Sequence, residues 1–324
     1  MTEENLKKGA VPDPEDNRDY IFEALGSAPV LDVDWEKGFN IENKLGFKLK
    51  PKNQHQSYSC VGQSYSTYNA VKKVINSIYN EVSAKSIYSL IALGNNQGAY
   101  LRDGADTLEN NGALLEKKLP SYNKEGIATE VHMTNKDWYI ASAVEEMKKL
   151  KVEDYYRVTS WNIDGFAKAI RDGHGMVAGL VGNNNGTWLT TYPQPPHSNT
   201  PQNELWAHAL FFGKFRLNNG KKELGCLNSW GDIGESGWQW IGEEWFKDDG
   251  RWIFNPWVLI NKNMNNESAK VLKDANSSAV GIWLPAISED VLKSYALNMG
   301  ITIPYLPDGK IDWETLIQGN FQLK

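Results

Sequence analysis

The sequence changes character near residue 164, and this change limits the possible folds more than any other feature. Before it, apolar residues recur at helical spacing in several segments. After one more short helical segment at 165–173, the apolar runs become short and typical of strands. An Asn-Gly pair at 219–220 separates two of these runs, which predicts a tight β-hairpin. We therefore predict an α+β protein with helices in its first half and an antiparallel sheet in its second. The predicted helices lie at 61–78, 83–94, 102–112 and 136–151, and the predicted strands at 176–181, 206–216, 222–230, 237–242 and 257–260.

The two ends of the chain differ in composition from its middle. Residues 1–50 are rich in Pro, Asp, Glu, Lys and Asn, so we expect an irregular arm on the surface of a domain formed by residues 51–262. Residues 263–278 are polar and poor in aromatic residues, which is typical of a linker. Residues 279–324 carry two short helical segments and predict a small helical accessory unit that docks on the main domain or on a partner.

Composition and charge exclude several classes of protein. The 324 residues carry a formal net charge of −6 and the basic residues are spread thinly, so a nucleic-acid partner is not expected. No segment approaches the roughly 20 apolar residues of a membrane span, and residues 1–22 lack the apolar core of a secretion signal. Two cysteines permit at most one disulfide. We therefore expect a soluble, unexported protein, cytoplasmic or associated with a larger assembly.

Residues that commonly hold metals and cofactors are not spaced for that purpose. The five histidines and two cysteines fit no zinc pattern, and no glycine-rich phosphate loop is present. We expect neither a metal nor a cofactor. Any chemistry must then come from the side chains themselves.

Cys60 is the better candidate of the two cysteines for a nucleophile. It lies at the predicted N-terminus of the helix at 61–78, where the partial positive charge of a helix end lowers the pKa of a thiol. Without a nearby histidine, Cys60 is equally well explained as a buried packing residue. Cys226 has no basic group placed to activate it, and we interpret it as a small buried apolar residue.

His208 is the histidine with the most unusual surroundings. It lies inside the apolar run ELWAHALFFGKF, where an imidazole needs polar partners. A lone histidine on such a strand is more often structural than catalytic. However, Asn228 follows twenty residues later on the next strand segment, where it can fix the tautomer and orientation of the imidazole. The other histidines lie in polar or Gly/Pro-rich segments: His55, His132, His174 and His197.

Together these residues give the chain a resemblance to the papain-like cysteine peptidases. The order Cys, His, Asn, with 148 residues between Cys60 and His208, matches that family. The segment NSWG at 228–231 followed by GESGWQWI matches it as well, as does the Asn-Gln pair at 53–54. Looser similarities extend the resemblance over roughly residues 50–260. The resemblance implies a helical left lobe, an antiparallel right lobe and a cleft between them.

The resemblance also implies a role for each matching residue. Cys60 would attack the carbonyl carbon of a peptide bond, and His208 would hold its proton and later deliver it to the leaving amine. Asn228 would orient His208. The side-chain amide of Gln54 would stabilise the oxyanion of the intermediate together with the backbone N–H of Cys60, a contribution of roughly 3 to 4 kcal/mol per donor.

The substrate groove resembles that of the family less closely. The resemblance implies that Gly98 binds the main chain of a protein or peptide substrate, and that Trp230 covers the His–Asn contact. Gln97 replaces one of the family's paired glycines, and Ala207 stands where glycine usually precedes the histidine. Residues 1–50 are also shorter than the usual inhibitory pro-segment and would cover at most part of the groove.

The segment around the nucleophile departs from the family pattern too. The usual Cys-Gly-Ser-Cys-Trp is SYSCV here, so the disulfide-forming cysteine is Ser57 and the bulky tryptophan is Val61. Loss of that disulfide is consistent with a reducing compartment. It leaves all four implied catalytic residues in place.

Two other functions remain open from the sequence. One is another acyl transfer by the same residues, such as a transpeptidase, a transglutaminase-like enzyme or a cell-wall peptidase; Gln54 and the NSWG segment argue against it. The other is a catalytically silent binding or assembly protein that acts through residues 279–324, against which the presence of all four residues argues. We therefore predict a cysteine endopeptidase.

Overall fold

The computed structural model describes residues 2–16, 19–25, 33–74, 80–247 and 252–261. The chain divides into two units, Met1–Asn261 and Lys262–Lys324, and all the described residues belong to the first. The predicted linker at 263–278 and accessory unit at 279–324 therefore lie outside the described residues. None of the helices in the described part has the length and apolar character that crossing a membrane requires.

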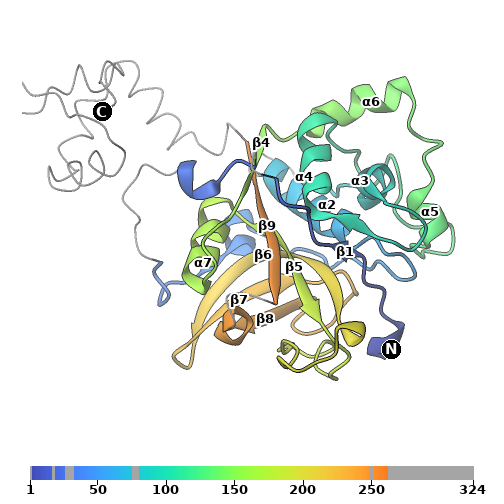
Figure 1. Cartoon of the computed structure of the whole chain (residues 1–324). Helices are drawn as coiled ribbons and strands as arrows, with labels where there is room; N and C mark the ends of the chain where they lie inside the picture. The colour runs from blue at the N-terminus through green and yellow to red at the C-terminus, as the bar shows by residue number, and fades with distance from the viewer. Residues whose placement is uncertain (1, 17–18, 26–32, 75–79, 248–251, 262–324) are drawn as a thin grey trace, which may run out of the picture. The chain divides into compact units, whose positions relative to one another are not determined.

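Helix α2 (Cys60–Val74) is the centre of the helical half (Figure 1). It begins at Cys60, as the apolar spacing predicts, and it packs against α3 and α4. The predicted last turn, 75–78, lies outside the described residues. The apolar face of α2 is fully buried along Val61, Tyr65, Tyr68 and Val71. The other helices of this half are α3 (Ala84–Ile91), α4 (Leu101–Asn110), α5 (Glu130–Thr134) and α6 (Ala141–Met147).

The second half forms an antiparallel sheet, in which a tight β-hairpin joins β6 to β7. The strand order is β4-β9-β5-β6-β7-β8, and β2 pairs with β6. The hairpin between β6 and β7 turns through Asn219 and Gly220, whose positive φ angles of 49° and 75° suit the tight turn predicted there. The strands are β2 (Phe39–Asn40), β4 (Asp154–Arg157), β5 (Met176–Gly182), β6 (Trp206–Asn218), β7 (Lys221–Leu227), β8 (Trp238–Gly242) and β9 (Ile253–Ile260).

Alternate residues of the sheet contribute to two hydrophobic cores. On β6, Ala209 and Phe211 belong to the core that the sheet shares with α2 and α3. Leu210 and Phe212 belong to a second core, which includes α7 (Ile163–Asp172). The two sets alternate because successive side chains of a strand point to opposite faces. The α+β architecture with a helical lobe and an antiparallel lobe, as predicted, is confirmed.

The structure departs from the prediction at the beginning of the chain and at one strand. Residues 33–50 are not an irregular surface segment, because β2 extends the sheet and Ile41 of α1 (Ile41–Leu45) is fully buried. The boundary expected at residue 50 thus falls after elements that already belong to the domain. Strand β4 has four half-buried residues and no apolar alternation, which explains why the sequence does not reveal it. The remaining short elements are η1 (Glu3–Asn5), β1 (Ala10–Val11), η2 (Phe22–Leu25), β3 (Ala99–Tyr100), η3 (Lys148–Leu150), η4 (Gln202–Glu204) and η5 (Glu243–Phe246).

Candidate active site

Cys60 lies where the N-terminus of α2 meets strand β6. The thiol is fully buried, and the backbone of Ala209, the residue after His208, hydrogen-bonds to it. One turn further along α2, the hydroxyl of Ser64 donates to the carbonyl oxygen of Ala209 at 3.0 Å, which holds the helix against the strand. The structure therefore brings Cys60 to the strand that carries His208, across 148 residues of sequence.

The imidazole of His208 is fixed from two directions. Its Nε2 lies 2.9 Å from Oδ1 of Asn228, and the Trp230 ring stacks on it with centroids 4.1 Å apart and an angle of 15° between planes. Its Nδ1 is buried and has no hydrogen-bond partner among the described residues. Asn228 and Trp230 thus leave one ring nitrogen available, as a proton carrier requires.

Gln239 on β8 is a residue of this site that the sequence analysis missed. Its Oε1 accepts a hydrogen bond of 2.7 Å from Nδ2 of Asn228, which forces Oδ1 of Asn228 toward His208. Its own Nε2 donates to the carbonyl oxygens of Trp188 and Thr190. The signal was present in the sequence, because Gln239 is a polar residue between two tryptophans of a predicted strand.

Gln54 is held by hydrogen bonds to three other residues, Ser229, Ser57 and Lys7. Its backbone N–H and its side-chain Oε1 bind the carbonyl and the hydroxyl of Ser229, at 2.8 and 2.7 Å. Its Nε2 donates to the carbonyl oxygens of Ser57 and Lys7, at 3.0 and 2.9 Å. One of the donors predicted for an oxyanion is therefore engaged by a backbone carbonyl of the arm.

Residues 3–13 of the arm cover this site, and we call them the covering segment. The carbonyl oxygen of Lys7 accepts hydrogen bonds from Gln54 and from Nε1 of Trp230, the latter at 3.2 Å. Two residues later the backbone of Gly9 hydrogen-bonds to Cys60. Strand β1 then pairs in parallel with β3, next to Gly98. The covering segment thus runs past each predicted element of the site in turn.

Two glycines permit this close approach. A Cβ added to Gly9 would lie 1.9 Å from the carbonyl oxygen of Tyr58, and one added to Gly98 would lie 1.9 Å from the carbonyl oxygen of Gly9. Backbone atoms cannot retreat from such overlaps without moving the chain. Gly98 also has φ +75°, a left-handed conformation that favours glycine. The covering segment therefore fits only because both positions lack side chains.

Carboxylates anchor the covering segment at both ends. Glu3 is buried and accepts hydrogen bonds from the backbone N–H groups of Gly186 and Trp188, at 2.9 and 2.7 Å. Asp13 accepts from the N–H of Arg102 and from Nε1 of Trp257, at 2.9 and 2.8 Å. Each of these charge-assisted hydrogen bonds contributes roughly 1.5 to 3 kcal/mol. The segment is tied to both lobes.

The covered site favours a neutral thiol and a neutral imidazole. Burial raises the pKa of the Cys60 thiol to about 11, although backbone hydrogen bonds oppose the rise. Burial also lowers the pKa of His208 to about 3; its contact with Asn228 opposes this change, whereas the nearby ammonium of Lys8 adds to it. The thiolate expected at a helix N-terminus is therefore not the stable form while the covering segment is in place.

Several other residues named in the sequence analysis make contacts that do not involve the candidate nucleophile or its histidine. The hydroxyl of Ser57, which replaces the disulfide-forming cysteine, contacts the carbonyl of Gln54 and the hydroxyl of Ser59. His55 packs against Tyr122 and takes no part in the site. Both cysteines, Cys60 and Cys226, are free thiols. In the described part of the chain no three acidic, histidine or cysteine side chains are grouped to hold a metal ion.

Comparisons with known proteins agree with this geometry at the level of the fold. No protein-family model and no curated protein matches the sequence. Among solved structures, xylellain, a cysteine protease from Xylella fastidiosa, matches with a TM-score of 0.63 and 19% identity, over 79% of this chain and 97% of its own. Procathepsin L2 from the larval midgut of Tenebrio molitor matches with 0.60 and 17%, over 80% and 81%. Bromelain from Ananas comosus, solved with the inhibitor E64, matches with 0.52 and 16%, over 69% and 98%.

These similar structures are all papain-like cysteine proteases. At 16% to 19% identity they establish how the chain folds, and they leave the roles of individual residues to be argued from the site. The chain has the papain-like two-lobed fold, as the sequence predicts.

Proposed function

We propose that this chain is a cysteine peptidase that hydrolyses peptide bonds with Cys60 as its nucleophile, and that the covering segment keeps it latent. One observation supports this above all others. The N-terminus of α2 meets β6 so that Cys60 contacts Ala209, the residue after His208. The imidazole of His208 has an Nδ1 with no described partner and an Nε2 held by Asn228. A structural histidine would be expected to use both ring nitrogens.

The proposed reaction begins once the covering segment has left. Water then reaches the thiol, so burial no longer opposes ionisation, and the helix end favours the thiolate. The proton moves from Cys60 Sγ to Nδ1 of His208. The sulfur attacks the carbonyl carbon of the substrate, and the oxyanion that forms receives hydrogen bonds from Nε2 of Gln54 and the N–H of Cys60.

Collapse of this intermediate breaks the peptide bond. His208 gives the proton at Nδ1 to the leaving amine, and the acyl group stays on Cys60 as a thioester. Water then gives a proton to His208 and attacks the thioester, which releases the acid and restores the thiol. Asn228, held by Gln239, keeps the imidazole in one orientation throughout.

The direction of the covering segment accounts for its resistance to cleavage in this scheme. The leaving amine must lie at His208, so the part of a substrate after the cleaved bond lies toward Trp230 and the part before it toward Gly98. The covering segment passes Trp230 at Lys7 and reaches Gly98 at Gly9, which is the opposite direction. Its peptide bonds are therefore presented to Cys60 the wrong way round.

Alkylation of the two thiols at different pH values tests the proposal. The wild-type chain and a Gly9→Val variant are treated with iodoacetamide between pH 5 and 10, and the adducts are located by mass. We expect neither thiol of the wild type to react at pH 6, and only Cys60 to react in the variant. The proposal fails if Cys60 of the variant needs a pH above about 8.5, the value of a free thiol, or if Cys226 reacts equally.

Analysis of the products separates hydrolysis from acyl transfer. A fluorogenic peptide is incubated with the Gly9→Val variant, with and without a primary amine as a competing acceptor. Free acid as the main product in both samples supports hydrolysis. An amide of the added amine as the main product would show acyl transfer in place of hydrolysis.

A further inference from the structure

Glu130, the first residue of α5, receives hydrogen bonds from three separate segments. The residue is buried, with 6% of its surface exposed. Its Oε2 accepts from the backbone N–H of Tyr58 at 2.8 Å. Its Oε1 accepts from the hydroxyl of Tyr88 at 2.8 Å and from the backbone N–H of Asn96 at 3.2 Å. One carboxylate thus joins a turn, a helix and a loop.

Two of these segments hold residues that take part in the proposed reaction. Tyr58 lies between Gln54 and Cys60, in the turn that sets both proposed oxyanion donors. Asn96 lies two residues before Gly98, in a loop closed by a hydrogen bond of 3.0 Å between Leu93 N–H and the Gly98 carbonyl. Glu130 therefore connects the nucleophile with the strand edge where a substrate would bind.

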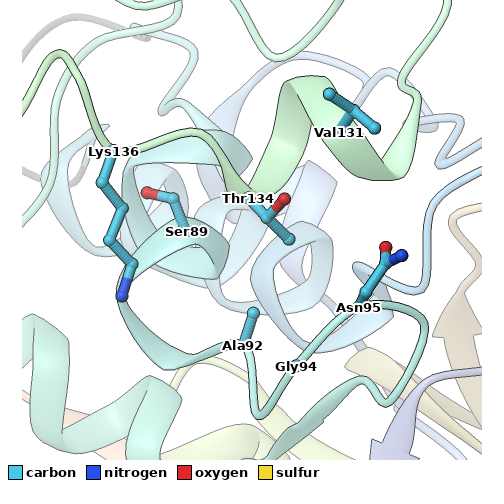
Figure 2. Close-up of a pocket in the computed structure, with 7 residues that line it drawn as sticks. All are labelled: Ser89, Ala92, Gly94, Asn95, Val131, Thr134 and Lys136. Atoms are coloured by element: carbon cyan, nitrogen blue, oxygen red, sulfur yellow. The ribbon is translucent and has the colours of Figure 1, made fainter.

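Side-chain packing contributes little to the junction between α5 and the loop that contains Asn96. A pocket of about 320 Å³ lies between α5 and the loop, as Figure 2 shows. Val131 and Thr134 line it from α5, and Gly94 and Asn95 line it from the loop. Because this space is open, the loop does not rest on α5 there. The hydrogen bond from Asn96 to Glu130 spans the junction instead.

We propose that Glu130 is a positioning residue that fixes the distance between the nucleophile's turn and the substrate groove. The inference rests on the proposed peptidase function. Glu130 touches none of the reacting atoms, and it acts through the backbone of Tyr58 and Asn96. A displacement of about 1 Å between groove and nucleophile is enough to lower a rate by up to about 100-fold.

Glutamine is the informative replacement at this position. All three partners donate hydrogen bonds, and a carboxylate has only acceptors. An amide must point its NH₂ group at one side, where it meets either the Tyr58 N–H or the Asn96 N–H. The Tyr88 hydroxyl can rotate, but a backbone N–H cannot. Glu130→Gln therefore keeps the shape of the side chain and breaks one of the two backbone connections.

The experiment compares Glu130→Gln with Tyr88→Phe, which removes the third donor and leaves both backbone connections intact. Both are made in the full chain, in the wild-type and Gly9→Val backgrounds. Hydrolysis of a fluorogenic peptide is measured well below each melting temperature. We expect Glu130→Gln to lower kcat/KM by about 10- to 100-fold, through KM if the Asn96 connection breaks and through kcat if the Tyr58 connection breaks. Tyr88→Phe should stay within about threefold.

Each other result has a definite meaning. Equal kcat/KM in Glu130→Gln and its parent, or an equal loss in Tyr88→Phe, overturns the positioning role and leaves the peptidase proposal intact. No hydrolysis by either parent overturns the peptidase proposal itself. If Glu130→Gln does not fold, Glu130→Asp takes its place, since it keeps both acceptors but withdraws them by one methylene. An unchanged kcat/KM in that variant also overturns the inference.

Discussion

The two cysteines occupy buried regions that look alike by exposure and differ in what covers them. Cys226 lies on β7 inside the sheet, paired with Phe212 and Gln239 on the neighbouring strands, and its thiol contacts the carbonyl oxygen of Gln239 at 3.5 Å. Cys60 lies at a helix end, and one of its neighbours is the backbone of Gly9 from the covering segment. Burial raises both pKa values, to about 12 for Cys226 and about 11 for Cys60.

Burial has a different meaning in the two regions. The cover of Cys226 is the sheet, so exposing that thiol requires unfolding the lobe. Part of the cover of Cys60 is a segment that holds no secondary structure beyond a 3₁₀ turn and a two-residue strand. A thiol can therefore be inert in one state and reactive in another when its cover is a separate segment of the chain.

Replacing each cysteine in turn should give the largest difference between the regions. In the Gly9→Val background we expect Cys60→Ser to lower kcat for peptide hydrolysis by at least ~10⁴-fold, because no other group supplies the nucleophile. Cys226→Ser should change it by less than about threefold. Initial rates with a fluorogenic peptide measure both. Comparable losses in the two variants would contradict this difference between the two thiols.

Displacing the covering segment should have the second largest effect. The side chain introduced by Gly9→Val overlaps the Tyr58 carbonyl, so the covered state becomes unfavourable. We expect the rate of hydrolysis to rise roughly 100-fold, in proportion to the fraction of uncovered molecules. Glu4→Val is the control, because Glu4 is exposed in the same segment. A similar rise in the control, or none in Gly9→Val, would show that the segment does not limit activity.

Disturbing the support of the imidazole should have a smaller effect. Gln239→Leu removes the acceptor that orients Asn228 and leaves the Trp188 and Thr190 carbonyls without their donor. We expect kcat to fall about tenfold in the Gly9→Val background, with little change in KM. The control is a melting temperature that, as in the wild type, lies well above the assay temperature. A change confined to KM would place Gln239 in substrate binding instead.

Alkaline stability should show the smallest difference. A pKa raised in the folded state stabilises the fold below the unfolded value of about 8.5 and loses this contribution as the pH rises toward the folded value. For Cys226 the free energy of unfolding should therefore fall by about 2 kcal/mol between pH 8 and 10. Urea unfolding of Cys226→Ala should show a shallower decline by that amount. An identical decline in both proteins would contradict the raised pKa.

Most of the fold, and most residues of the candidate site, could be predicted from the sequence. The helical start at Cys60 and the Asn219–Gly220 hairpin both have local causes, apolar spacing and turn geometry, and both are confirmed. Strand β4 has no local signal, because it is held by pairing with β9 rather than by an apolar face. Long-range pairing of this kind has no counterpart in the local pattern of residues.

The covering of the site could not be predicted for a similar reason. Gly9 and Gly98 are 89 residues apart, and only folding shows that Gly98 must leave room for the backbone of Gly9, and Gly9 for that of Tyr58. Lys7 acts through its carbonyl oxygen, which every residue has, so its side chain gives no indication of the contact. Gln239 was detectable as a polar residue in an apolar strand, but its partner Asn228 was known only as the partner of His208.

The covalent attachment of the covering segment to the domain has a consequence for any competitor. A tethered segment meets its site at an effective concentration of roughly millimolar or more, whatever the concentration of the protein. Dilution therefore cannot uncover Cys60, and a short peptide has to compete against that constant local supply. A single cut between Asp13 and β2 would change this completely. The segment would become a separate ligand, and from then on its hold on the site would fall as the solution is diluted.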